Sequence, residues 1–241
     1  MSRSRILALA GALTAALLAG CGGGGGDAGT TPTGNVVAFP LQAGYKALIR
    51  NGYSIDFDVT GSCTGTATQV NQKPVDDSFE GTASVHSVVS TQSVSLPGCG
   101  SAVPDIITAT ATDYFGADPD ADYASLGSAI PGAEYGVYQA PAIFPVSVKV
   151  GDSGSYGTEI LYSDSSKAQV TGQAVRTWRV DADTASTAIG TLTTQVFHPA
   201  SQLDYTQQSR YRIGVDGMLT IIGVDIQFAG TNALHLVLTP K

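Results

Sequence analysis

The stretch LDYTQQSRYRIGVDGMLTIIGVDIQF, residues 203–228, decides the fold class of this chain. It contains two runs of about ten residues that are rich in alternating, β-branched and aromatic side chains, which is typical of strands. The segment GVDG at 214–217 between them has the composition of a hairpin turn. A third run, ALHLVLT, places Leu234, Leu236 and Leu238 on one face. We therefore predict an antiparallel meander at the end of the chain.

The same patterns recur upstream. YSIDFDV at 53–59 alternates strictly, and IITATATDYF at 106–115 is rich in β-branched and aromatic residues. FPVSVKV at 144–150 puts its Phe and three Val residues on one side, as expected of a strand. No segment is expected to sustain an amphipathic helical pattern. These patterns predict an all-β protein.

We predict two subdomains and a connection. Residues 36–116 have the size of an antiparallel sandwich, with an immunoglobulin-like one as an option, and residues 145–241 form the meander. Residues 117–144 alternate weakly and contain three prolines, which indicates a linker or a long crossing loop. One continuous sandwich is the competing architecture. A transmembrane barrel is disfavoured because the strands are few and aromatic girdles are not evident.

The N-terminus has the pattern of an export signal. Arg3 and Arg5 precede an apolar run of 13 residues at 6–18, which is too short to span a bilayer as a helix. The following LAGC at 18–21 resembles the lipobox of Gram-negative bacterial lipoproteins, whose peptidase cuts before the cysteine. Residues 1–20 are therefore expected to be a lipoprotein signal peptide.

The resemblance implies that Cys21 carries a diacylglyceryl group and an N-terminal acyl chain such as palmitate. Gly22, in place of an aspartate, implies sorting to the outer membrane, with the protein in the cell envelope facing the periplasm or the cell surface. The following glycine-rich stretch has no large apolar side chain, so residues 21–35 are expected to form a flexible tether with an end-to-end distance of roughly 20 Å.

The charge of the mature chain limits its partners. After Arg3 and Arg5 leave with the signal, 10 basic residues face 20 acidic ones, a net charge of −10. Such a surface argues against nucleic-acid binding, which needs clustered basic residues. It also argues against electrostatic adhesion to anionic lipid. We therefore expect membrane attachment through Cys21 alone.

The three cysteines have separate expected roles. With Cys21 lipidated, Cys63 and Cys99 remain as an even pair in an oxidising compartment, which predicts a disulfide. Closing that loop stabilises the fold by about 3–4 kcal/mol in the chain-entropy estimate. Metal ligation is the rival interpretation, but the sequence lacks a second CxxC and nearby paired histidines.

One motif suggests catalysis. GDSGS at 151–155 resembles the nucleophile segment of chymotrypsin-like serine proteases, and His86 and Asp113 precede Ser153 in the order of that family. The contexts depart from the family, and 67 residues between His86 and Ser153 are too few for two successive barrels. A hairpin turn is the plainer interpretation. We therefore predict no catalytic constellation and a protein that is not an enzyme.

A second motif suggests a cation. Asp118, Asp120 and Asp122 alternate in DPDADY, and calcium favours such oxygen ligands. An EF-hand is excluded because Tyr123 occupies the sixth position and Ala129 the twelfth. A solvated acidic loop is the alternative that we favour. Apart from this calcium candidate, no cofactor is expected.

The larger side chains near the C-terminus have plain expected roles. Trp178, Tyr205 and Tyr211 are expected to fill a core rather than to line a site. A set of arginines on neighbouring strands is expected to pair with aspartates across strands, with a small anion-binding patch as the alternative. This set is Arg176, Arg179, Arg210 and Arg212.

These observations predict a membrane-anchored envelope lipoprotein that acts as a binding or structural module for an unknown protein or small-molecule ligand. Two alternatives remain. One is an envelope hydrolase that uses Ser153. The other is a lipid or lipoprotein carrier, which needs an apolar cavity in the C-terminal sheet.

Overall fold

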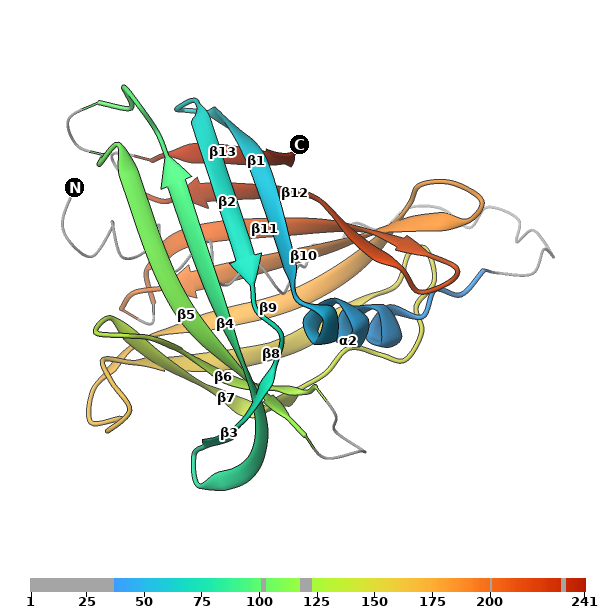
Figure 1. The fold of residues 1–241 in the computed structure, drawn as a ribbon, viewed down its shortest axis with the longest axis horizontal. Coiled ribbons are helices and arrows are strands. Elements are labelled where there is room, and N and C mark those ends of the chain that lie inside the picture. Colours follow the sequence, from blue (N-terminus) through green and yellow to red (C-terminus); the bar gives the residue numbers. More distant parts are fainter. Residues whose placement is uncertain (1–36, 101–102, 118–122, 200, 231–232) are drawn as a thin grey trace.

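The computed structural model describes residues 37–100, 103–117, 123–199, 201–230 and 233–241. In this part the chain forms one helix and thirteen strands (Figure 1). Their bounds are α2 Leu41–Asn51, β1 Tyr53–Gly61, β2 Gly65–Asn71, β3 Val75–Phe79, β4 Thr82–Ser95, β5 Ile106–Gly116, β6 Ser125–Ile130, β7 Glu134–Ala142, β8 Ser153–Tyr162, β9 Val170–Ala182, β10 Thr187–Phe197, β11 Leu203–Gly214, β12 Leu219–Phe228 and β13 His235–Pro240.

The strands form one closed antiparallel barrel. From β4 to β13, each strand pairs with the next one along the chain, and β13 then pairs with β1. β1 pairs with β2, and β2 pairs with β4, which closes a ring of twelve strands. β3 pairs only with β4 and lies outside the ring. Closure leaves no free edge in the ring, which removes the main route to edge-to-edge aggregation.

The predicted C-terminal meander is part of this ring. The Gly214 N–H donates to the Met218 carbonyl oxygen at 2.9 Å and closes the turn between β11 and β12, and Gly217 there has φ of +83°. Along β11 the side chains of one face are buried and face the interior, while Arg210 and Arg212 on the other face are exposed. The alternation seen in the sequence is therefore that of a barrel wall.

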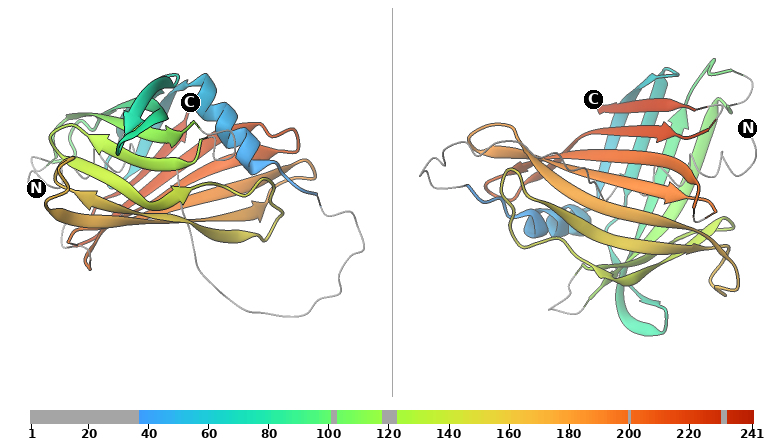
Figure 2. Two further views of the ribbon diagram at one scale, coloured as in Figure 1. Left: turned by 90° about the horizontal axis from the view of Figure 1, so that it is seen from below. Right: turned by 180° about the vertical axis from the view of Figure 1, so that it is seen from behind.

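The two ends of the barrel differ. We call the end at which β8, β10 and β12 begin the helix end, because α2 packs there (Figures 1 and 2). The apolar side chains of Leu41, Tyr45 and Ile49 are buried against the barrel. Cys63 and Cys99 lie at the opposite end, which we call the disulfide end. The helix therefore covers one opening.

The predicted sandwich with an added meander is wrong, although the all-β class is confirmed. The segments assigned to the two parts are joined by pairing of β1 with β13, across almost the whole length of the sequence. Residues 117–144, expected as a linker or crossing loop, contain β6 and β7 of the barrel wall. A buried face alternating with an exposed face occurs in both architectures, so alternation does not reveal closure.

Two local predictions are also wrong. The chain does contain an amphipathic helix, since Leu41, Tyr45 and Ile49 are spaced four residues apart on its buried face. FPVSVKV at 144–150 is a loop with a single bridge between Val148 and Phe39. The predicted signal peptide and the predicted tether, residues 1–35, lie outside the described residues.

Candidate functional site

The structure brings Cys63 and Cys99 to disulfide distance. Their Cα atoms are 5.3 Å apart, within the normal range for a bridge. The lipidation candidate Cys21 lies outside the described residues, and so do the calcium candidates Asp118, Asp120 and Asp122. Within the described ranges, no group of three or more His, Cys, Asp or Glu side chains is arranged to hold a metal ion.

The residues of the protease-like motif have other partners. His86 Nδ1 on β4 lies 3.4 Å from Asp76 Oδ1, and the His86 ring stacks on Tyr123 with 5.1 Å between ring centroids. Asp113 on β5 accepts a hydrogen bond from Ser90 Oγ. Ser153 begins β8 and is exposed, and strands β7 and β6 lie between β8 and β5 in the barrel wall. These contacts do not assemble a triad.

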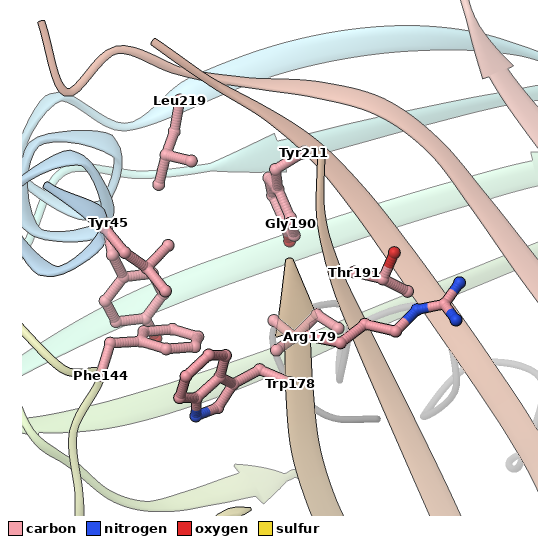
Figure 3. A pocket seen from close by; sticks show the side chains of 10 residues that line it. Tyr45, Phe144, Trp178, Arg179, Gly190, Thr191, Tyr211 and Leu219 are labelled. Atoms are coloured by element: carbon pink, nitrogen blue, oxygen red, sulfur yellow. The ribbon is translucent and has the colours of Figure 1, made fainter. Parts of the chain in front are cut away.

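An apolar pocket lies between α2 and the barrel wall. Aromatic and aliphatic side chains from the helix, the loop before β8, and strands β9 to β12 surround it, and Figure 3 shows the rings of Tyr45, Phe144 and Trp178 gathered on one side. Arg179 and Thr191 also border it, with side chains directed away from these rings (Figure 3). The remaining lining residues are Leu41, Gly190, Leu192, Tyr211 and Leu219.

This pocket, which we call the helix-end pocket, is small. Its cavity volume is about 20 Å³, enough for one or two waters. The edge of Tyr45 meets the ring of Phe144 at a centroid distance of 5.0 Å. Burial raises the pKa of Tyr45 well above its ordinary value. A larger ligand group therefore needs α2 to shift, since Leu41 and Tyr45 form the helical wall.

A charged cluster lies deeper inside the barrel. Arg176 on β9 donates to Glu159 on β8, with Nη1 2.5 Å from Oε2, and both side chains are buried. Ser128 Oγ donates to the other Glu159 oxygen at 2.7 Å. The guanidinium carbon of Arg176 lies 5.2 Å from the centroid of Tyr138, a cation–π distance. Ser128 therefore contacts Glu159, and Tyr138 contacts Arg176, so both members of the ion pair have a further partner.

A glycine makes room for this carboxylate. A Cβ built on Gly136 of β7 would lie 2.2 Å from Glu159 Oε1. Any larger residue there would displace the Glu159 side chain. Burial is the largest single effect and lowers the pKa of Arg176, but the charges of Glu159 and Tyr138 and the hydrogen bond to Glu159 together outweigh it and raise the pKa. Arg176 therefore stays charged in the interior.

Asp113 is the titratable member of this cluster. It is half-buried and faces an internal cavity of about 20 Å³ that Glu159 and Arg176 also line. Burial, and then the negative charge of Glu159, raise the pKa of Asp113 to about 7, against the lowering effects of Arg176 and Ser90. The Asp113 carboxyl therefore gains and loses its proton near neutral pH.

A histidine extends the line of charges toward the surface. His198 Nε2 lies 3.0 Å from Glu134, which borders the same internal cavity, and His198 Nδ1 lies 3.4 Å from Asp204. Hydrogen bonds to Asp204 and then to Glu134 raise the pKa of His198 to about 9. The imidazolium therefore stabilises this side of the barrel over the neutral range.

The sequence predictions found part of these sites. Trp178 and Tyr211 pack against the core as predicted, but they also line the helix-end pocket. The predicted pairing of arginines with aspartates across strands holds for Arg212, which lies 2.7 Å from Asp183, whereas Arg179 pairs with Asp181 of its own strand β9 at 3.1 Å. Arg176 pairs with a glutamate inside the barrel instead.

The chain matches no known protein family, no curated protein and no solved structure. None of the described helices is long and apolar enough to cross a membrane. The class that the geometry defines is therefore a closed twelve-strand antiparallel barrel, covered by a helix at one end and holding a charged cluster in its interior.

Proposed function

We propose that the protein is a lipid-anchored envelope lipoprotein that acts as a binding module and holds one apolar group of its ligand in the helix-end pocket. The observation that carries this proposal is the gathering of Tyr45, Phe144 and Trp178 beneath a helix. Ligand sites are typically apolar and aromatic with few polar groups. The lipid anchor rests on the lipobox at 18–21, and it keeps the module in the envelope.

The carrier alternative is less well supported. The helix-end pocket lies against β9 to β12, where that alternative places its cavity, but its volume of about 20 Å³ is far below the roughly 300 Å³ of small ligand sites. The hydrolase alternative lacks support, because the recorded partners of His86 are Asp76 and Tyr123. A binding site for a single apolar group needs neither a large cavity nor a triad.

The binding site is tested with Trp178, the only tryptophan of the chain. The mature protein is titrated with indole and with dodecanoate, and a saturable change in tryptophan emission is expected from one of them. Gly190→Ala should weaken that binding at least several-fold, because its methyl group narrows the pocket. The nearest atom to a Cβ at Gly190 is Ile213 Cδ1, the end of a side chain, at 2.9 Å, and the next two lie at 3.5 and 4.0 Å, so a shift of that side chain accommodates the methyl group.

Gly223→Ala is the matched control. A Cβ there meets its nearest atom, the Leu238 carbonyl oxygen, at an ordinary 3.4 Å, and Gly223 does not line the pocket. Its affinity should equal that of the wild type. Unsaturable responses to both probes, or equal weakening by the two variants, would overturn the proposed binding site.

The anchor has its own test. The intact mass of protein purified from envelopes should equal that of a chain beginning at Cys21 plus a diacylglyceryl group and one acyl chain. A mass without these additions would overturn the lipid anchor and leave the binding test unaffected.

A further inference from the structure

The loops at the helix end carry an unusual set of exposed aliphatic side chains. Val146 and Met218 are 72 % and 67 % exposed. We name the whole set the aliphatic rim. It consists of Val37, Ile143, Val146, Val150, Val215 and Met218. Among the described residues, four other large apolar side chains are also exposed, Val70, Val75, Ile106 and Val170, and none of them lies in the loops that carry the rim.

The segments that carry the rim lie side by side. Phe39 and Val148 form two backbone hydrogen bonds, of 2.8 and 2.9 Å, which join the start of the described chain to the loop before β8. A Cβ built on Gly217 would lie 3.1 Å from Pro40 Cγ, so the turn before β12 also touches this segment. Figures 1 and 2 show the three segments together around the N-terminal end of α2.

The carboxylates in these loops accept hydrogen bonds from backbone N–H groups a few residues away. Asp152 accepts the backbone N–H of Lys149 at 2.8 Å, and Asp216 accepts that of Met218 at 3.0 Å. They fix the turns that hold Val150 and Met218 outward. The rim is therefore a built apolar surface on ordered turns.

We propose that the aliphatic rim docks on the lipid surface to which the protein is anchored, so that the helix end faces the membrane. This inference rests on the proposed anchor at Cys21. Cys21 lies sixteen positions before Val37, which is itself a member of the rim. A glycine-rich coil of that length spans on average roughly 20–24 Å.

The opposite end is placed farther away by the barrel itself. β11 has 12 residues, which extend for about 40 Å along a strand and roughly 30 Å along the axis of a tilted barrel. The lipid therefore sits nearer the rim than the disulfide end. Single exposed valines are common on protein surfaces, but a cluster beside a lipid attachment point favours a membrane contact.

Depth-dependent quenching tests the orientation. Lipidated protein is placed in phosphatidylcholine vesicles that contain brominated acyl chains, and emission is compared with the wild type to subtract Trp178. Val146→Trp and Met218→Trp should gain emission that bromolipid quenches at least threefold more than in the controls. The controls are Ile106→Trp and Val170→Trp, which are 67 % and 56 % exposed at the disulfide end.

The outcomes separate the two proposals. Protein that fails to float with the vesicles would overturn the anchor, and the docking with it. Protein that floats but shows equal quenching at both ends would overturn the docking alone. Unchanged melting of all four variants, followed by circular dichroism, ensures that the comparison is between folded proteins.

Discussion

Gly44 on α2 is the position at which one methyl group tests how the helix covers the barrel. A Cβ at Gly44 would lie 2.3 Å from the Gly217 carbonyl oxygen and 2.9 Å from Leu219 Cγ. The oxygen belongs to the backbone of the turn before β12 and cannot rotate away. In Gly44→Ala, either the helix or that turn must therefore move.

Two effects of this substitution have opposite signs. Alanine is the better helix former by about 0.8–1.0 kcal/mol. Overpacking a tight contact costs about 1–3 kcal/mol. Because the contact is with backbone, we expect the steric cost to win, with a net loss of about 1–2 kcal/mol. For a chain of this size that lowers the melting temperature by roughly 2–8 °C.

The assay combines thermal melting with acrylamide quenching of Trp178, which lines the pocket beneath α2. Gly44→Ala should melt lower and quench more, because a displaced helix admits solvent. Ala47→Gly on the exposed face of the same helix is the control, and it should lose about 1 kcal/mol of helix propensity with unchanged quenching. A Gly44→Ala protein that melts above the wild type with unchanged quenching would refute the tight contact between α2 and the barrel.

Three further predictions concern charge and covalent closure. The pKa of Asp113 is raised from 3.8 to about 7, so between these pH values the folded protein keeps a proton that the unfolded chain releases, and the stability of the fold falls as pH rises through this range. In urea melts, Asp113→Asn should therefore be as stable as the wild type near pH 4 and more stable at pH 8, by up to about 4 kcal/mol. A difference that is the same at both pH values would contradict the raised pKa. The pKa of His198 is raised from 6.5 to about 9, so the charged imidazole stabilises the folded state fully below pH 6.5, and this stabilisation is lost as pH rises through 9. His198→Gln should lower the free energy of unfolding by about 1–2 kcal/mol at pH 6 and by little at pH 10. Equal losses at both pH values would count against the ion pairs. Reduction of the exported protein should raise its intact mass by two hydrogens, and Cys63→Ser should cost about 3–4 kcal/mol, whereas two free thiols before reduction would disprove the bridge.

The sequence predicts individual strands, but it does not predict which distant strands pair with one another. The runs at 53–59 and 106–115 lie within β1 and β5, and the hairpin around 214–217 forms as predicted. The pairing of β1 with β13 depends on distant register, which local alternation leaves open. β6 and β7 were missed because short strands with glycines at 127 and 136 alternate weakly.

The helix-end pocket was missed for a related reason. Its helical wall comes from α2, whose 11 residues follow a proline and include Gly44, so the helical pattern is short. Trp178 was expected to be core, and it is packed against the core, but a site at a barrel end uses the same aromatic side chains as the core does. The spacing of apolar residues predicts which face of a strand is buried, but it does not show which of those residues lie at the end of the barrel, where they can line a pocket.

Residues 203–213 contain a sequence feature that favours a barrel with a polar interior. Along LDYTQQSRYRI, Gln207 and Ser209 share the inward face with Tyr205 and Tyr211, and all four are buried. Gln207 Nε2 donates to Ser209 Oγ at 3.1 Å, so this strand places a hydrogen-bonded polar pair in the interior. The inner face of a sandwich packs against a second sheet about 10 Å away and is filled mainly by apolar side chains, whereas a barrel interior has room for a polar layer. A strand that mixes buried tyrosines with buried amides and hydroxyls therefore favours a closed barrel, and the buried pair of Glu159 and Arg176 belongs to that same interior.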